Sequence, residues 1–199
     1  RAIIGEIPMA MSCCESGRNL VLPVQNSEQA SWVKQAKIYA IEHLSQLYPH
    51  FARQTPLPLV AEQTVKQFNE INELDISDVI GQPLAKRALE IAASGNHNLL
   101  FIGPPGTGKT MLASRLAGIL PKMTEAEALE VASIQSISNQ NINAKSWLTR
   151  PFRAPHHTAS SAALVGGGSQ PKPGEISLAH NGVLFLDELP EFERKVLDV

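Results

Sequence analysis

The sequence is poor in cysteine. Its only cysteines among 199 residues are the adjacent Cys13 and Cys14, and neighbouring cysteines rarely bridge each other. A disulfide-stapled secreted scaffold is therefore excluded, and no set of ligands at zinc-binding spacing accompanies the pair. We expect both thiols to be reduced and partly buried in a cytoplasmic protein.

The sequence also lacks a long apolar run and a strong excess of charge. No stretch approaches the roughly 20 apolar residues that cross a membrane, and no signal peptide is visible after Arg1. The net charge is −2, so binding to nucleic acid requires a local basic surface. The chain starts at Arg1 and stops soon after an acidic motif, and we expect it to be a piece of a longer protein.

Residues 103–110, Gly-Pro-Pro-Gly-Thr-Gly-Lys-Thr, match the phosphate-binding P-loop pattern G-x-x-x-x-G-K-[ST]. They follow the apolar run 98–102, which predicts a buried parallel strand, and precede 111–118, which predicts a helix. A strand that leads through a Gly-rich turn into a helix directs backbone N–H groups at one point, where the helix dipole also favours phosphate. The residues predicted to contact ATP here are Gly103, Pro104, Pro105, Gly106, Thr107, Gly108, Lys109, Thr110 and Met111.

Particular residues of the P-loop predict particular roles. Gly106 and Gly108 let the backbone wrap closely around a phosphate because no Cβ intervenes. Lys109 is expected to reach the β- and γ-phosphates and to act in catalysis, and the Thr110 hydroxyl is expected to hold Mg²⁺. A chance match in a Gly/Pro turn is the alternative, and the strand and helix predicted on either side argue against it.

A second motif completes the predicted nucleotide site. Residues 182–188, Gly-Val-Leu-Phe-Leu-Asp-Glu, indicate an apolar strand that ends in two acids, the Walker B form. Asp187 is expected to bind Mg²⁺, directly or through water, and Glu188 to polarise the attacking water. An acidic pair alone is also typical of a solvated strand end, but after a P-loop it indicates ATP hydrolysis.

The segment 78–82, Asp-Val-Ile-Gly-Gln, precedes a predicted helix over 83–94. The functional interpretation is an adenine pocket, in which Val79 and Ile80 pack on the base. The alternative is a plain turn before a helix. The apolar residues expected on the buried face of this helix are Leu84, Ala88, Leu89 and Ile91.

The whole chain is predicted to have an α/β organisation in three parts. Residues 1–51 alternate between short strands and helices, 52–74 are proline-punctuated and polar and indicate a linker, and 75–199 hold the ATPase motifs. Within the first part, strands are expected at 1–7, 19–24 and 37–40, and helices at 8–16, 27–36 and 41–48.

Three further features lie between the two ATP motifs. Thr124 and Glu127 form a capping box, which predicts the start of a helix. His156 and His157 suggest a metal site, but adjacent side chains point apart on a strand or helix, so we favour a structural or ATP-sensing role. The loop 166–174 is rich in Gly and Pro, and we expect it to contact a substrate.

Several stretches of the chain lie in the order found in one known family. They are the P-loop, 78–82, 152–158, 164–168, 174–182 and 189–192. On these residues the chain resembles the magnesium-chelatase-like AAA+ proteins, specifically the YifB/ComM competence group. The resemblance covers essentially the whole chain and is most specific over 152–192.

The resemblance implies a P-loop AAA+ parallel sheet with flanking helices over 75–199. It implies that 1–51 are the C-terminal part of a Lon-protease-like domain. Lon peptidases carry a catalytic Lys just after a Gly-x-Leu-type turn, whereas Pro8 follows the corresponding residues here. The segment that would hold a nucleophilic Ser is absent from this sequence, so we expect no peptidase activity.

The resemblance also implies a homo-oligomeric ring, usually a hexamer, with ATP and Mg²⁺ at the subunit interfaces and no membrane partner. ComM-type proteins are DNA helicases that drive branch migration during natural transformation. The loop 166–174 corresponds to an insert that faces the central pore, which makes Lys172 a candidate DNA contact. The arginine finger, the sensors and the lid are expected beyond Val199, so residues 1–199 alone are expected to hydrolyse ATP poorly.

Two other functions stay open on the sequence. One is a magnesium-chelatase ATPase subunit, a motor that drives a partner enzyme but does not normally carry the Lon-like segment. The other is a nucleotide-gated ring that scaffolds recombination proteins. Stimulation of ATP hydrolysis by DNA distinguishes the helicase from both.

Overall fold

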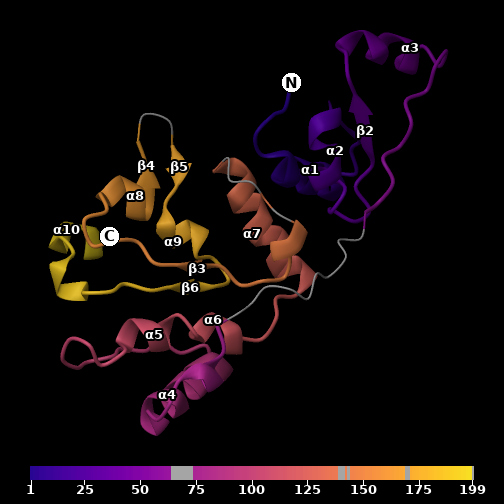
Figure 1. Cartoon of the computed structure of the whole chain (residues 1–199). Coiled ribbons are helices and arrows are strands. Elements are labelled where there is room, and N and C mark those ends of the chain that lie inside the picture. The colour runs from indigo at the N-terminus through magenta and orange to yellow at the C-terminus, as the bar shows by residue number, and fades with distance from the viewer. Residues whose placement is uncertain (64–73, 139–141, 143, 169–170, 199) are drawn as a thin grey trace. The chain divides into compact units, whose positions relative to one another are not determined.

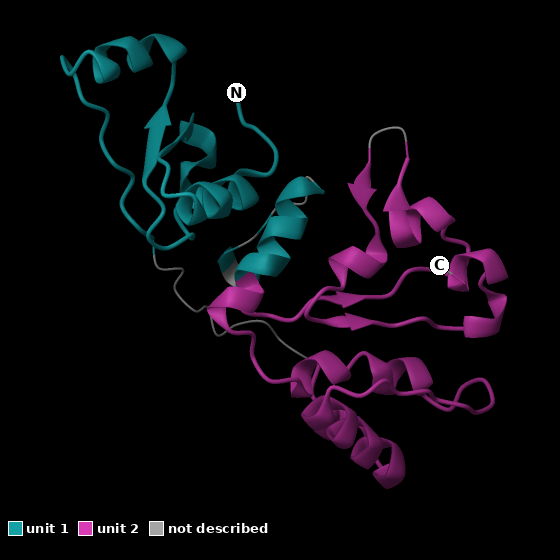
Figure 2. Ribbon diagram, turned by 180° about the vertical axis from the view of Figure 1, so that it is seen from behind, with its two compact units in different colours: residues 1–68, 129–147 teal, residues 69–128, 148–199 magenta. Residues whose placement is uncertain are grey.

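The computed structural model describes residues 1–63, 74–138, 142, 144–168 and 171–198. The chain divides into two compact units, which Figure 2 colours separately: residues 1–68 with 129–147, and residues 69–128 with 148–199. Helix α7, Glu125–Ile137, contributes residues to both. No helix in the described part of the chain is long and apolar enough to cross a membrane.

The first unit places short helices around one pair of strands. Strands β1, Leu20–Pro23, and β2, Ile38–Ile41, pair in parallel, with Leu20 opposite Ile38. The chain passes from one to the other through a helical connection, because parallel strands cannot be joined by a tight turn. The helical elements of this unit besides α7 are α1 (Glu6–Glu15), η1 (Val24–Asn26), α2 (Ser27–Ala30), η2 (Leu44–Gln46), α3 (Leu47–Phe51) and η4 (Ala144–Ser146).

A buried apolar cluster holds the first unit together. Ile7 of α1, Leu22 of β1 and Ile38 of β2 are each 2% exposed or less. The indole rings of Trp32 and Trp147 meet edge to face with their centroids 5.1 Å apart. Removal of this apolar surface from water is the main favourable contribution to the stability of the unit.

The strand predicted over 1–7 is wrong. Helix α1 begins at Glu6, directly after Gly5, whose φ of 81° is left-handed. The Asn26 amide accepts from the Ile3 N–H at 2.9 Å and donates to the Ile3 carbonyl at 3.0 Å. This side chain satisfies the backbone groups that a strand ladder would otherwise occupy.

The other two strands predicted for this unit are confirmed by β1 and β2, whereas one predicted helix is shorter than expected and another is shifted along the chain. The helix predicted over 27–36 ends at Ala30. The helix predicted over 41–48 starts only at Leu44 because β2 extends into its first residue. Leu44 and Tyr48 are 77% and 76% exposed, so their shared spacing does not bury them.

The second unit joins the helices around the P-loop to two small pairs of strands (Figure 1). Strand β3, Phe152–Arg153, pairs in parallel with β6, Val183–Leu184. Strands β4, Gly166–Gly167, and β5, Lys172–Pro173, form an antiparallel hairpin. The parallel pairs and the helices that flank them confirm the α/β fold class. The helical elements of this unit besides α7 are η3 (Ile76–Asp78), α4 (Pro83–Gly95), α5 (Lys109–Ala113), α6 (Leu116–Ile119), α8 (Ser161–Val165), α9 (Glu175–Leu178), η5 (Leu189–Glu191) and α10 (Arg194–Leu197).

The buried strand predicted over 98–102 is absent from this structure. Leu100 is 66% exposed and Ile102 is 88% exposed. An open cavity of about 1090 Å³ has this segment and residues 183–188 among its walls. An apolar run becomes a buried strand only where a neighbour satisfies its backbone groups, and no strand within the described residues pairs with this one.

Helix α4 confirms the helix predicted over 83–94, with Pro83 in its first turn. Only part of the predicted buried face is buried. Leu89 is fully buried and packs with Val79 and Leu112, whereas Leu84 and Ile91 are 86% and 49% exposed. The buried stripe of the helix is therefore narrower than its apolar stripe.

Helix α7 begins at the predicted capping box. The Glu127 N–H donates to Thr124 Oγ1 at 3.3 Å, and Glu127 Oε2 accepts from the Thr124 N–H at 2.7 Å. These reciprocal bonds confirm the box. Hydrogen bonds from Thr124, and more weakly from Arg150, hold the pKa of the Glu127 carboxyl below its usual value.

We predict that Thr124→Ala lowers the free energy of unfolding by about 1 kcal/mol, because the helix loses its N-cap acceptor. The ionised Glu127 carboxylate also contributes to the free energy of unfolding. This contribution should be complete above the pKa of Glu in the unfolded chain, and it should be lost as the pH falls through the lower pKa of Glu127 in the folded protein. Urea unfolding at several pH values, followed by circular dichroism, measures both effects. Lys122→Ala, at an exposed position before the cap, is the control and should change stability by less than about 0.5 kcal/mol. Equal midpoints for Thr124→Ala and the wild type would contradict this account.

Candidate nucleotide site

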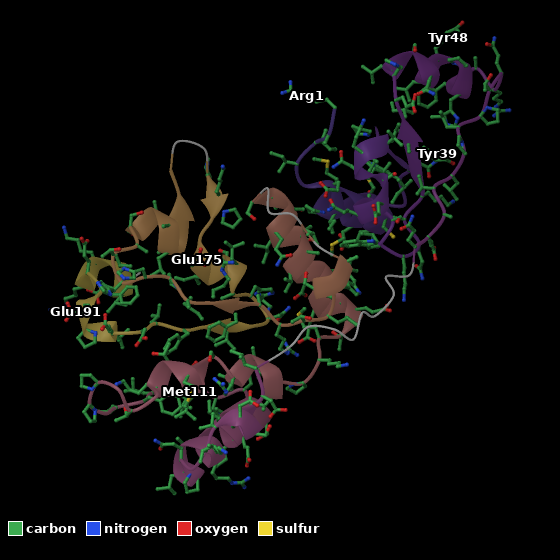
Figure 3. All side chains as sticks on the ribbon, in the orientation of Figure 1. Arg1, Tyr39, Tyr48, Met111, Glu175 and Glu191 are labelled. Carbon is green, nitrogen blue, oxygen red and sulfur yellow. The ribbon has the colours of Figure 1, made fainter. Side chains whose placement is uncertain are left out.

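The P-loop backbone adopts a left-handed conformation at two of its glycines. Gly106 and Gly108 have φ values of 78° and 82°, in a left-handed region that side-chain-bearing residues rarely adopt. A Cβ at Gly108 would also lie 3.2 Å from Met111 Cε. The loop leads into α5, which Figure 3 shows with Met111 labelled. The helix predicted over 111–118 is divided between α5 and α6.

Lys109 is folded over the loop that precedes it. Its Nζ donates to the carbonyl oxygens of Gly103 and Pro104, both at 3.0 Å. Thr107 Oγ1 donates to the same Pro104 carbonyl at 3.0 Å. The two bonds made by Lys109 hold its ammonium group against the P-loop, so the loop carries a positive charge.

Thr110 and Asp187 are brought together although 77 residues separate them in the chain. The Thr110 hydroxyl donates to Asp187 Oδ2 at 2.7 Å, and Asp187 Oδ1 accepts from the Glu188 N–H at 3.0 Å. Hydroxyl and carboxylate oxygens are hard ligands of the kind that Mg²⁺ prefers, and Mg²⁺ needs few of them because it keeps several waters. The pair therefore fits the metal expected from the sequence. Within the described residues, no group of three or more His, Cys, Asp or Glu side chains forms a larger metal cluster.

Glu188 has a partner that the sequence analysis missed. Its Oε2 lies 3.2 Å from His157 Nδ1. The rings of His156 and His157 lie with their centroids 4.1 Å apart, contrary to the expectation that adjacent side chains point apart. The reason is that the two residues occupy a turn, where the alternation of a strand does not apply. The spacing of the two motifs gives no signal for this contact.

Arg115 joins the segment before α4 to the P-loop region, a role that the sequence did not reveal. Its Nε donates to the Asp75 carbonyl at 3.0 Å, and its Nη2 lies 3.8 Å from Asp78 Oδ2. Val79 is 1% exposed and Ile80 is 96% exposed. Val79 therefore holds the segment in place through buried packing. Of these two residues, only Ile80 is exposed enough to contact a ligand.

The predicted substrate loop 166–174 is a hairpin at its base. A Cβ on Gly174 would collide with the backbone N of Gly166 and would lie 2.5 Å from the Leu164 carbonyl oxygen. Glycine is required here because residue 174 lies so close to the backbone where α8 leads into β4. Lys172 lies exposed on β5, and 169–170 lie outside the described residues.

Both ends of the hairpin are tied to the region around β3 and β6. On one side, Arg153 of β3 donates to both carboxylate oxygens of Glu175, at 2.5 and 2.7 Å. Figure 3 labels Glu175 on α9, directly after β5. The hydrogen bond to Glu175 raises the pKa of the Arg153 guanidinium. On the other side, Leu164 of α8 packs in one cluster with Phe192 and Leu186.

Comparison with known proteins relates this geometry to a family. Residues 75–199 match the family described as magnesium chelatase, subunit ChlI. The whole chain is 55% identical to Competence protein ComM of Haemophilus influenzae, of which it covers 40%. It is 50% identical to Uncharacterized protein YifB of Escherichia coli, of which it covers 39%.

A shorter similarity concerns the Lon proteases. Over 75 residues the chain is 37% identical to the Archaeal Lon protease of Methanothermobacter thermautotrophicus, which involves 38% of this chain and 12% of that protein. The chain spans about 40% of the length of the ComM and YifB relatives. Since the family match covers more than half of its residues, the chain belongs to the magnesium chelatase, subunit ChlI, family of AAA+ proteins.

Proposed function

We propose that this chain is part of an ATP-hydrolysing AAA+ motor. We further propose that the motor is a hexameric DNA helicase that promotes branch migration in homologous recombination during natural transformation. The hydrogen bond between Thr110 and Asp187 carries the ATPase part of the proposal, because it brings the P-loop and the acidic motif to one place. The name Competence protein, borne by a relative 55% identical to this chain, supports the part that concerns transformation.

The P-loop residues bind and orient the nucleotide in this proposal. Bound MgATP supplies the γ-phosphoryl group and a cation that neutralises the charge developing on it. Lys109 exchanges its bonds to the carbonyls of Gly103 and Pro104 for bonds to phosphate oxygens. The Thr110 hydroxyl and the Asp187 carboxylate, 2.7 Å apart, would hold the Mg²⁺ that accompanies the nucleotide.

Glu188 acts as the general base. Its carboxylate orients the attacking water and takes a proton from it as the water oxygen bonds to the γ-phosphorus and the bond from that phosphorus to the bridging oxygen of ADP breaks. The Glu188 backbone is held at the site because its N–H donates to Asp187 at 3.0 Å. One acid thus binds the metal while the next activates water, which is why both follow the same strand.

The segment before α4 is proposed to hold the adenine base. Ile80 is 96% exposed and supplies an apolar surface on which a base can pack. Val79 contributes indirectly, since its burial beside Leu89 fixes the segment in place.

The hairpin formed by β4 and β5 is proposed to contact DNA in the pore of a ring. Lys172 is exposed, and no acidic side chain within the described residues lies at salt-bridge distance from it. The chain has a net charge of −2, so attraction to the phosphate backbone must come from local cations such as this one, repeated around a ring. The ion pair between Arg153 and Glu175 joins the hairpin to β3, which supports a mechanical role.

We propose three parts for the chain: 1–51 as the end of a Lon-like domain without peptidase activity, 52–74 as a linker, and 75–199 as the first part of the AAA+ module. We also propose that the protein works in the cytoplasm. The family match over 75–199 supports the third assignment.

A chelatase-type motor that drives a partner enzyme is the second candidate, and the match to the ChlI subunit favours it. A nucleotide-gated scaffold for recombination proteins is the third. Both predict that DNA leaves the ATPase rate unchanged, whereas the helicase predicts that branched DNA raises it. The ATPase rate of the full-length protein with and without branched DNA therefore distinguishes the helicase from the other two candidates.

Lys109→Ala and Glu188→Gln should have different effects on the nucleotide. Lys109→Ala removes the charge facing the phosphates and should weaken ATP binding by roughly 30-fold or more. Glu188→Gln should bind ATP normally and turn it over about 10²–10⁴-fold more slowly, because only water activation is lost. Fluorescent ATP binding and single-turnover hydrolysis separate the two steps. Equal loss of binding in both variants would contradict the assignments.

Lys172→Ala should weaken DNA binding by the full-length protein and slow branch migration. The slope of log K against log salt should fall by about 1 for each phosphate group that the lysine no longer neutralises. Basal ATP hydrolysis should survive, because Lys172 lies outside the proposed nucleotide site. Lys195→Ala, an exposed lysine on α10, is the matched control and should behave as the wild type. Branch migration at the normal rate in Lys172→Ala would refute the pore-contact assignment.

The N-terminal unit should not cleave peptides, with or without ATP, because Pro8 cannot serve as a base. Casein and short fluorogenic peptides test this directly. Cleavage that persists through further purification, and disappears when one residue of 1–51 is changed, would show that the unit is a peptidase.

A further inference from the structure

A second, smaller cavity lies entirely within the first unit, which Figure 2 shows in teal. It is open to solvent and has a volume of about 300 Å³. Its walls contain two acidic side chains, Glu6 and Glu28, and its described lining includes no Lys, Arg or His. Neither the ATP-binding motifs nor the hairpin contributes to it, so none of the roles proposed above accounts for this negative charge.

Glu6 is a buried acid without a protein partner. It begins α1 and is only 4% exposed, and no hydrogen bond or ion pair within the described residues reaches its carboxylate. No side-chain oxygen of these residues is both sealed from solvent and unpartnered, so the carboxylate keeps its contact with water through the cavity. The positive end of the α1 dipole favours its negative charge, but so enclosed a carboxylate costs stability as long as no cation pairs with it.

The rest of the cavity wall suits a flat cation on an apolar stem. The Gln29 side-chain amide donates to the Ile142 carbonyl at 3.4 Å, which leaves the amide oxygen as an acceptor. Trp32, which is 5% exposed, contributes its indole to the wall, and a cation over the face of an indole is attracted to it. Ile4 adds apolar surface. A guanidinium group has five N–H donors in one plane and no acceptor, so it matches these acceptors and this ring.

We propose that this cavity binds a guanidinium group carried on a short aliphatic chain, with Glu6 as its counter-ion. The volume is at the lower limit for small-molecule sites, which suits a ligand of this size. A metal ion is disfavoured, because no group of three or more His, Cys, Asp or Glu side chains gathers in the described part of the chain. The guanidinium comes either from a free alkylguanidine or from an arginine side chain elsewhere in the full-length protein. The proposal is independent of the ATPase assignment.

Calorimetric titration of the full-length protein with n-butylguanidinium tests the first source. A Kd on the order of 1 mM is expected for so small a ligand. The neutral n-butylurea has the same shape without the charge and should bind at least about 10-fold more weakly. Glu6→Gln should weaken binding of n-butylguanidinium by about 10-fold or more, because a hydrogen-bonded ion pair is lost. Glu15→Gln, at the exposed other end of α1, is the matched control and should bind as the wild type does.

Melting temperatures measured without ligand distinguish the two sources. If the guanidinium is a free ligand, Glu6→Gln should leave the melting temperature unchanged or raise it, since it removes an unpaired buried charge. If an arginine of the protein itself occupies the cavity, n-butylguanidinium should not bind, and Glu6→Gln should melt more than about 2 °C below Glu15→Gln.

Three results would each overturn the proposal. They are equal binding of n-butylurea and n-butylguanidinium, equal binding of n-butylguanidinium by Glu6→Gln and the wild type, and absence of binding with no fall in the melting temperature of Glu6→Gln. The comparison of the two ligands on the wild type does not depend on the folding of any variant.

Discussion

The hydrogen bond from Thr110 to Asp187 is the interaction on which the rest of the proposed site depends. It joins the first turn of α5 to the residues that follow β6, at 2.7 Å between the two oxygens. The other Asp187 oxygen accepts from the Glu188 N–H, so one aspartate contacts both the proposed metal ligand Thr110 and the backbone of the proposed base. The P-loop conformation, with two left-handed glycines before α5, places the Thr110 hydroxyl where it can reach this partner.

A second constraint comes from β3 and the turn that follows it. Arg153 on β3 pairs with Glu175 at the base of the hairpin, and four residues later His157 contacts Glu188. This short segment therefore connects the hairpin to the proposed base. The cluster of Leu164, Phe192 and Leu186 links the other side of the hairpin to the same acidic motif. The proposed substrate loop and the proposed base are therefore held by the same segments.

The sequence predicted those features that a few consecutive residues determine. The glycine pattern of the P-loop, the capping box at Thr124 and the strands β1 and β2 follow from local chemistry, and each is present in the structure. The strand over 98–102 is missing because its formation depends on a neighbour that local sequence cannot supply. The burial of Val79 likewise depends on residues distant in the sequence, Leu89 and Leu112, so local sequence did not predict it.

The sequence motifs name the residues of the proposed site, but they do not predict the contacts among them. Motif order indicated that Thr110 and Asp187 belong together, since both were assigned to one metal. Nothing in the spacing indicated that His157 reaches Glu188, because the turn that aligns the two histidine rings has no periodic signature. Arg115 likewise meets Asp75 only through the packing of the P-loop region against the segment before α4.

The most direct measurement of the central claim is the Mg²⁺ requirement of ATP turnover in Asp187→Asn compared with the wild type. If Thr110 and Asp187 together hold the metal, removing the carboxylate charge should raise the Mg²⁺ concentration for half-maximal turnover about tenfold or more. ATP binding in the absence of Mg²⁺ should stay unchanged, because the P-loop is intact. An unaltered Mg²⁺ dependence in Asp187→Asn would contradict the account.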